Sequence, residues 1–123
     1  MSFKWNDKEP IYLQLKDLVK DMILSGDIHE GDALPSVRQV AMDYKVNPIT
    51  VSKSYQILVD EELVEKRRGL GMFVQNGAAI KVQTNENELF IKEDWPKILT
   101  KIKHLNLDTT QLINSLKAIG SNQ

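Results

Sequence analysis

The side chains best suited to bind a charged ligand surround two helix starts in the run 34–51. Ser36 has the side chain of a good N-cap, and Gln39, three residues later, completes a capping box. Asn47 is a second good N-cap, and Pro48 follows at the first helical position, where its missing N–H costs nothing. Only residues 44–46 remain for a turn. Two short helices joined so closely predict a helix-turn-helix, whose second helix can enter the major groove of DNA.

The side chains near these two starts have the chemistry of base and phosphate contacts. Arg38 can bond guanine O6 and N7 in bidentate fashion, or it is an ordinary exposed helix arginine. Thr50 and Ser52 can bond phosphate or base, or they simply face solvent. Ile49 either packs against a thymine methyl group or belongs to the core. Lys53 is expected to contact a phosphate, which adds affinity without choosing a sequence.

A basic β-hairpin is predicted over residues 63–75, directly after the helix-turn-helix. Two β-prone runs flank Arg68-Gly69-Leu70-Gly71, and the glycines allow a tight reversal. Lys66, Arg67 and Arg68 carry positive charge here against Glu65 alone. A basic hairpin in this place is a wing, whose tip contacts phosphates or reaches a minor groove. The alternative is a solvated strand with no ligand.

Amphipathic helices must position these side chains. The first spans residues 10–25, with Pro10 at its first position and Gly26 just past its end. Helices at 36–44 and 48–61 follow, and the second turns Val51, Tyr55, Leu58 and Val59 inward. Phe3 and Trp5 are expected to pack on this domain or on a dimer partner. The predicted fold is therefore mostly α with a small β-hairpin, a winged helix-turn-helix over residues 1–76.

The tail, residues 77–123, is predicted to be a helical dimerisation segment. One helix is expected across 78–104, weak at 80–88 and kinked or restarted at Pro96. A last helix is capped by Asp108, with Gln111 completing a capping box, and ends at Gly120. The apolar stripes comprise Leu89, Phe90, Trp95, Ile98, Leu99, Ile102, Leu105, Leu112, Ile113 and Leu116. Two helices cannot bury so much apolar surface alone, so a second copy is favoured over an intramolecular core.

The composition excludes several classes of protein. The chain has 123 residues, no cysteine and two histidines in separate segments, so no metal site or cofactor is expected. It lacks a nucleophile elbow, a phosphate loop and a histidine cluster, which argues against an enzyme. No apolar stretch approaches the roughly 20 residues of a membrane span, so a cytoplasmic protein is expected. The net charge of −1 favours the alternative of a winged helix that binds protein, but the basic wing and Arg38 favour DNA.

Four pieces of the sequence are specific in their order and spacing. They are Pro10-Ile-Tyr-Leu-Gln-Leu, Gly31-Asp-Ala-Leu-Pro-Ser-Val-Arg-Gln-Val-Ala, Val46-Asn-Pro-Ile-Thr-Val-Ser-Lys-Ser-Tyr and Arg68-Gly-Leu-Gly-Met-Phe-Val. Together they resemble the GntR family of transcription regulators, most closely its short YtrA-type branch. The resemblance implies a homodimer that binds double-stranded operator DNA, most commonly as a repressor, with membrane-transporter genes as targets. The resemblance does not identify an effector. The tail has only about 45 residues after the wing, too few for a roomy ligand pocket.

The resemblance also implies which residues contact DNA. Ser36 and Arg38 match phosphate and base contacts of the family. The start of the recognition helix is formed by Asn47, Pro48, Ile49, Thr50, Ser52 and Lys53. Gly69 and Gly71 match the tip of the wing. Many relatives have arginine where Pro48 and Ser52 stand, so the resemblance gives no operator sequence. Lys45 and Glu62 stand where glycine is common. A positive φ there would cost about 1 kcal/mol, unless the local geometry differs.

Overall fold

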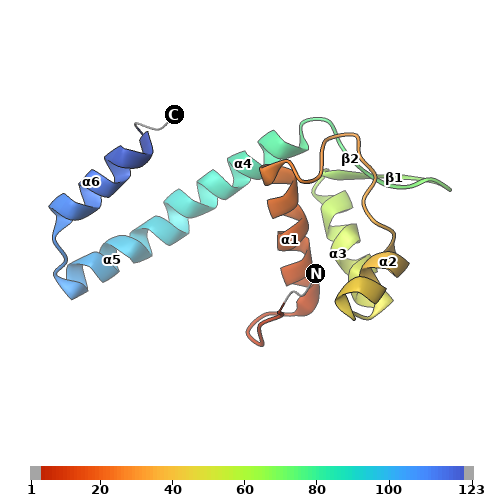
Figure 1. Ribbon diagram of the computed structural model, residues 1–123, viewed down its shortest axis with the longest axis horizontal. Helices are drawn as coiled ribbons and strands as arrows, with labels where there is room; N and C mark the ends of the chain where they lie inside the picture. Colours follow the sequence, from red (N-terminus) through yellow and green to blue (C-terminus); the bar gives the residue numbers. More distant parts are fainter. Residues whose placement is uncertain (1–3, 121–123) are drawn as a thin grey trace. The chain divides into compact units, whose positions relative to one another are not determined.

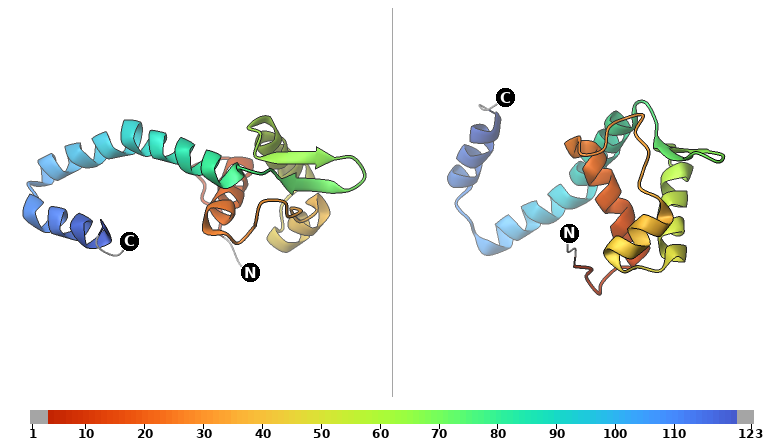
Figure 2. Two further views of the ribbon diagram at one scale, coloured as in Figure 1. Left: turned by 90° about the horizontal axis from the view of Figure 1, so that it is seen from above. Right: turned by 45° about the vertical axis from the view of Figure 1, so that its right-hand side comes forward.

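The computed structural model describes residues 4–120 and is mostly helical with one small hairpin, as predicted (Figures 1 and 2). The elements in chain order are α1 (Ile11–Ser25), α2 (Val37–Tyr44), α3 (Pro48–Asp60), β1 (Val64–Arg67), β2 (Gly71–Val74), α4 (Ala78–Leu89), the π-helical segment η1 (Phe90–Asp94), α5 (Trp95–Leu105) and α6 (Thr109–Gly120). They form two compact units, the first ending at Glu86 and the second beginning at Asn87.

Both N-caps of the helix-turn-helix are confirmed. Ser36 Oγ accepts a hydrogen bond from the Gln39 amide at 3.1 Å, and Asn47 Oδ1 accepts one from the Ile49 amide at 2.9 Å. The capping box is not completed, because the Gln39 side chain donates to Asp43 Oδ1 at 2.8 Å instead. The two helix starts therefore have the predicted positions, with one side chain turned along α2 rather than back to the cap.

Helix α1 differs from the prediction at its first residue. Pro10 is the N-cap, with φ −57° and ψ 143°, and not the first helical residue. Its carbonyl accepts hydrogen bonds from the amides of Leu13 and Gln14. The N–H that proline lacks is not needed at this position, so the helix loses no hydrogen bond. Gly26 ends the helix at φ 86°, in the left-handed conformation that glycine adopts without strain.

The core of the first unit lies around α3. Val51, Tyr55 and Leu58 are buried as predicted, whereas Val59 is only half-buried. Ser54 is also fully buried, which its polar side chain did not reveal in the sequence. Its hydroxyl donates to the Tyr12 carbonyl at 2.7 Å and so attaches α3 to α1. Burial of this serine is tolerated because its polar group is satisfied.

The hairpin forms within the predicted residues 63–75, and a short β-bridge adds a third neighbour. Val64 pairs with Val74 and Arg67 with Gly71 in the antiparallel ladder. On the other edge of β2, a β-bridge joins Ala33 to Phe73, and the Leu34 amide donates to the Met72 carbonyl at 2.7 Å. The base of the wing is thus held to the loop before α2, while its turn projects beyond the pairing, as Figure 2 shows.

Among residues 4–120, three non-glycine residues have a left-handed backbone. Lys45 has φ 55° and Glu62 has φ 60°, so the two positions where relatives often have glycine keep the geometry that glycine favours. Asn106, at φ 52° between α5 and α6, is the third, and asparagine tolerates this region better than lysine or glutamate does. Lys45 lies in the turn before the recognition helix, so the strain is stored next to the candidate site.

Helix α4 belongs mostly to the first unit. Ala78 and Val82 are buried in its core, and helix covers the stretch 80–88 that the sequence marked as weak. The contact boundary falls inside α4, ten residues after the predicted division behind residue 76, because these two side chains pack on the winged-helix core. That division, as a functional one, stays a prediction.

The helix is continuous but changes its winding near Pro96, where the sequence predicted a kink or a restart. The chain winds as a π-helix over η1, and α5 then begins at Trp95 with Pro96 in its first turn. Phe90 and Trp95 stack with ring centroids 6.2 Å apart. Asp108 caps α6, but its carboxylate accepts from the Thr110 amide at 2.9 Å and not from Gln111, the expected box partner.

Two sequence expectations concern the surface and the N-terminus. Trp5 packs against the core beside Tyr44, with ring centroids 6.1 Å apart, and Phe3 lies outside the described residues.

Within residues 4–120, no helix is long and apolar enough to span a bilayer. In the same range, no three His, Cys, Asp or Glu side chains gather in a way that could hold a metal ion.

Candidate nucleic-acid interface

The start of α3 presents its side chains outward. Ile49 exposes 75% of its surface, and Pro48, Ser52 and Lys53 are exposed as well, while Thr50 is half-buried. The opposite face of the same helix forms the centre of the core. The core alternative for Ile49 is therefore wrong within the described chain, and an aliphatic side chain stands free where a recognition helix would meet a groove.

A buried tyrosine fixes the loop before α2 against α3. Tyr55 Oη donates to the Pro35 carbonyl at 2.7 Å. Burial, with a smaller contribution from nearby Tyr44, raises the pKa of the Tyr55 hydroxyl far above its ordinary value, so it stays a donor. Because Pro35 directly precedes Ser36, this bond holds the start of α2 in place relative to the recognition helix.

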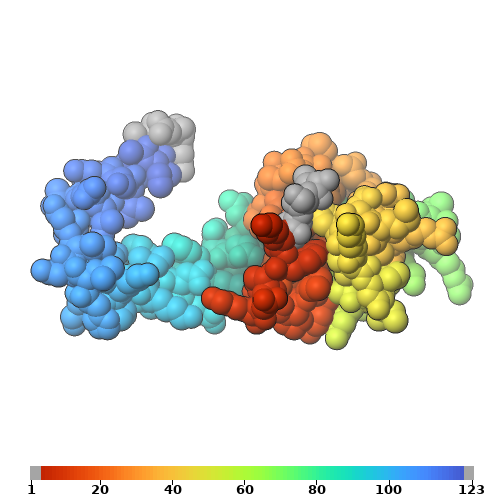
Figure 3. Space-filling view, turned by 60° about the horizontal axis from the view of Figure 1, so that its bottom comes forward, coloured from red at the N-terminus to blue at the C-terminus, as the bar shows by residue number. Residues whose placement is uncertain are grey.

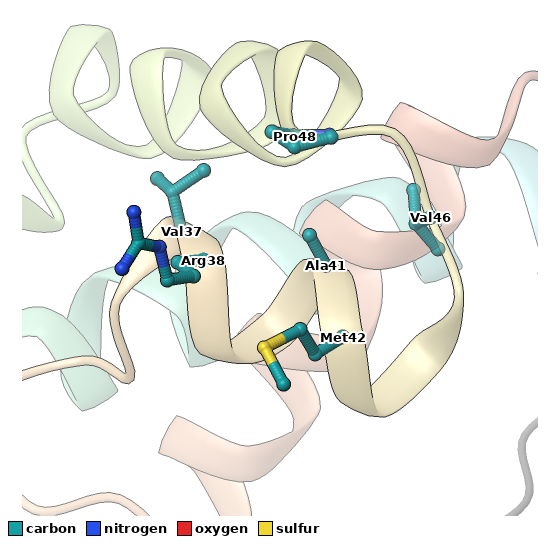
Figure 4. A pocket seen from close by; sticks show the side chains of 6 residues that line it. All are labelled: Val37, Arg38, Ala41, Met42, Val46 and Pro48. Carbon is teal, nitrogen blue, oxygen red and sulfur yellow. The ribbon is translucent and has the colours of Figure 1, made fainter.

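Arg38 is exposed and makes no hydrogen bond or ion pair with any residue between 4 and 120. It stands at the edge of an open hollow of about 620 Å³ between α2 and the start of α3 (Figure 4). In Figure 4 its guanidinium extends past Val37, while Met42 projects from the next turn of α2 and Pro48 closes the hollow from α3. The complete lining is Val37, Arg38, Ala41, Met42, Val46 and Pro48.

This hollow combines an apolar floor with one unpaired cation. Such a surface fits an apolar group that stands next to a negatively charged or carbonyl-rich one, as the sugars, methyl groups and phosphates of DNA do. Met42 exposes 66% of its surface, and the sequence reasoning missed it. The available signal was a methionine four residues after Arg38, which places both on one face of α2. Figure 3 shows this helix, in gold, lying open on the surface of the first unit.

Lys53 lies over an aromatic ring. Its ammonium nitrogen is 4.1 Å from the centroid of Tyr12 in α1, the distance of a cation–π contact. The lysine is still exposed, so it can meet a phosphate, and the ring limits the directions in which it points. Tyr12 was not among the predicted site residues, since only the packing of α1 on α3 brings it there.

The wing arginines differ from each other. Arg67 Nε lies 3.4 Å from Glu65 Oε2, and its guanidinium lies 4.3 Å from the centroid of the Phe73 ring. Arg68, the next residue, has no such partner among the described residues. The turn closes when the Leu70 amide donates to the Arg67 carbonyl at 2.9 Å, with Gly69 and Gly71 both at positive φ. The structure therefore leaves Arg68 as the freer of the two wing arginines.

The predicted dimerisation residues all lie in the second unit or at its start, and none of them is buried. Trp95, Ile102 and Leu112 are half-buried within the unit. The others are exposed, namely Leu89, Phe90, Ile98, Leu99, Leu105, Ile113 and Leu116. In residues 87–120 no side chain reaches full burial, so this unit has no core of its own. An apolar surface of this kind typically marks an interface.

Known proteins share both the sequence and the fold. Residues 11–74, just over half of the chain, match the family described as "Bacterial regulatory proteins, gntR family". The chain is 30% identical over 117 residues to the uncharacterised regulator YhcF of Bacillus subtilis, which covers 95% of each protein. It is 31% identical over 112 residues to the HTH-type transcriptional repressor YtrA of the same organism, covering 91% of this chain and 85% of YtrA.

Solved structures agree with this relationship. A GntR family transcriptional regulator from Listeria monocytogenes superposes with a TM-score of 0.74 at 26% identity, covering 93% of this chain and 98% of that one. The DNA-binding domain of AraR, solved in complex with operator ORX1, shares the fold at 23% identity and a TM-score of 0.55, covering 60% of this chain and 94% of that one.

These relatives are transcription regulators rather than enzymes, and the family match over residues 11–74 spans the helix-turn-helix and the wing of this chain. The chain therefore belongs to the gntR family of bacterial transcription regulators, in its short YtrA-type branch.

Proposed function

We propose that this regulator is a homodimeric repressor that reads a palindromic operator with α3 and the wing of each copy. The observation that carries the proposal is the exposed start of α3 beside the unpaired Arg38. One face of the helix is fixed in the core by Val51, Tyr55 and Leu58, so the other face is rigidly presented. A rigid, outward recognition helix is what base reading in a major groove requires.

The start of α3 also suits an approach to phosphate. The first amides of a helix carry partial positive charge, and those of α3 already donate to Asn47: Ile49 to its Oδ1 at 2.9 Å, and Thr50 and Val51 to its carbonyl at 2.9 and 3.2 Å. Direct contacts to phosphate must therefore come from the side chains around this helix start. Lys53 in α3 and Arg68 in the turn of the wing each add a full positive charge. Ser36, Thr50 and Ser52 offer hydroxyl groups, and the glycines at 69 and 71 let the wing backbone come close. We assign to these residues the positioning contacts, and to Arg38 a base contact.

The exposed apolar stripes of the second unit support a homodimer. Leu99, Leu105 and Ile113 each expose between 48% and 56% of their surface, which water would cover in a lone chain. Pairing with a second copy removes this surface from water and creates a two-fold axis. Such symmetry matches a palindromic operator, with half-sites about one helical turn, roughly 34 Å, apart or a multiple of it.

The sign and the targets of regulation follow from relatives. YtrA of Bacillus subtilis is named a repressor, and we extend that role to this chain. Control of membrane-transporter genes is proposed on the resemblance to the same branch. The genes next to this one, and any inverted repeat in their promoter, are the places to look for the operator. Because chromosomal DNA is the partner, the cytoplasm is the proposed location.

The test begins with selection of bound duplexes from a random DNA pool. Gel shifts then compare the selected operator with random DNA for the wild type and for Arg38→Ala. We expect Arg38→Ala to cost about 1–3 kcal/mol on the operator and much less on random DNA, because a base contact is lost. Lys101→Ala, which removes an exposed charge from α5, is the control and should change neither.

Two results would contradict this assignment. Equal losses on operator and random DNA would reduce Arg38 to a phosphate contact. A selection that enriches no sequence at all would favour the protein-binding alternative and remove the proposed function.

A further inference from the structure

The first turn of α4 receives its capping group from a distant loop. Gly77 precedes the helix, and its carbonyl accepts from the Lys81 amide at 3.0 Å, so it occupies the N-cap position without a capping side chain. Glu30 supplies the missing group. Its Oε1 accepts from the Gly77 amide at 2.9 Å, and its Oε2 accepts from the Ala79 amide at 3.2 Å. A carboxylate in this place also interacts favourably with the helix dipole.

The loop that carries Glu30 is itself attached to the wing. The Gly31 amide donates to the Val74 carbonyl at 2.8 Å, and the Val74 amide donates to the Asp32 carbonyl at 2.9 Å. These two bonds pair the loop with the last residue of β2, just before the chain turns into α4 (Figure 1). Glu30 therefore connects the wing strand to the amino end of the helix.

Other contacts hold one face of α4 on the domain, beginning with Ala78 in its first turn. Ala78 and Val82 are buried, and Lys81 Nζ lies 3.2 Å from the Glu62 carbonyl and 3.4 Å from its Oε2. Buried side chains fix which face of the helix packs on the domain. The two bonds from Glu30 act on the first turn, where the angle between helix and domain is set. No other side chain among residues 4–120 accepts a hydrogen bond from these two amides.

We infer that Glu30 is a positioning residue for operator recognition, because it fixes the direction in which the chain leaves each DNA-binding domain through α4. The inference rests on the homodimer proposed above. In such a dimer, a fixed exit direction restricts the half-site spacing that both domains can occupy together. A loosened first turn lets the two domains reach other half-site spacings. It also lowers the effective concentration of the second domain at the spacing that the wild type prefers.

The experiment uses the full chain and the selected operator, in duplexes whose spacer is lengthened or shortened by one and two base pairs. The variants are Glu30→Ala and Glu30→Gln, which keeps one acceptor oxygen. Asp27→Ala is the control, since it removes a loop carboxylate that has no partner among the described residues. Duplexes with a single half-site report on each domain alone.

For the wild type and Asp27→Ala, we expect affinity to fall about tenfold or more when the spacer changes by one base pair. For Glu30→Ala we expect a fall of less than about threefold, with Glu30→Gln between the two. Binding to a single half-site should stay within about twofold of wild type in every variant. Amide exchange should speed up at residues 78–81 in Glu30→Ala.

A spacer profile of Glu30→Ala that superposes on the wild type would overturn the inference. So would a matching loss on the single half-site, because Glu30 would then act only on the fold of the domain. A wild type that binds all spacers alike would also contradict it, while leaving two-site binding intact. Equal binding of full operator and single half-site would remove the homodimer proposal itself, and the inference with it.

Discussion

Ile49 leaves 75% of its surface in water at the start of the recognition helix, where polar side chains would be easier to solvate. An aliphatic side chain in that place gains most from an apolar partner in the groove, and the only one that DNA offers in the major groove is the thymine methyl group. We therefore expect the operator to contain a thymine whose methyl group matters. Ile49 would then contribute to the choice of operator sequence.

Replacing each operator thymine by uracil tests this contact, because the change removes only a methyl group. At one position in each half-site we expect a loss of about 0.5–1 kcal/mol, the value of one buried carbon group. In Ile49→Ala the same replacement should have no effect, whereas the neighbouring Ser52→Ala should respond as the wild type does. Gel shifts on the substituted duplexes give the answer. Equal sensitivity in the wild type and Ile49→Ala would disprove the assignment.

At the scale of the element, the wing shows two arginines with different freedom. Arg67 is held by Glu65 and by the Phe73 ring, so moving it to a phosphate requires breaking both contacts. Arg68 makes neither kind of contact with the described residues. We expect Arg68→Ala to reduce the slope of log affinity against log salt by about 1, and Arg67→Ala to reduce it less. Titrations at several salt concentrations measure this. Unchanged slopes in both variants would mean that the wing does not touch the DNA backbone.

The turn between α2 and α3 stores strain at Lys45, whose φ is 55°. Lys45→Gly should raise the free energy of unfolding by about 0.5–1 kcal/mol, because glycine adopts this conformation without a Cβ clash. Lys53→Gly, at an ordinary helical position, is the matched control and should lose about 1 kcal/mol. Urea unfolding distinguishes them. A loss at Lys45 comparable to that at Lys53 would show that the turn is not strained.

Local signals in the sequence were enough for the elements of the site. Both N-caps and the Gly-x-Gly hairpin depend on residues a few positions apart, and the structure has them where predicted. Contacts between distant residues were not accessible in this way. The Glu30 cap on α4 and the burial of Ser54 each depend on how distant segments pack, and no local pattern encodes that. The predicted capping box at Ser36 was wrong for a different reason. The Gln39 side chain had a second local partner, Asp43, and it bonds that residue instead.

At the scale of the molecule, the boundary inside α4 decides where the chain can be cut. Truncation after Gly77 would remove Ala78 and Val82 from the core, so the first unit should be tested as residues 1–86. We expect this fragment to fold, to bind a single half-site as the full chain does, and to bind the full operator far more weakly. The second contact would lose its high effective concentration. Full operator affinity in the fragment would leave the second unit without a role.

The mass of the complex on the selected operator tests the central claim most directly. Sedimentation of the full chain with a duplex that carries both half-sites should give two 14.1 kDa chains per duplex, and free protein at tens of micromolar should already be a dimer. A single chain per duplex at full affinity, with a monomer in free solution, would contradict the account of a homodimer that reads a palindrome.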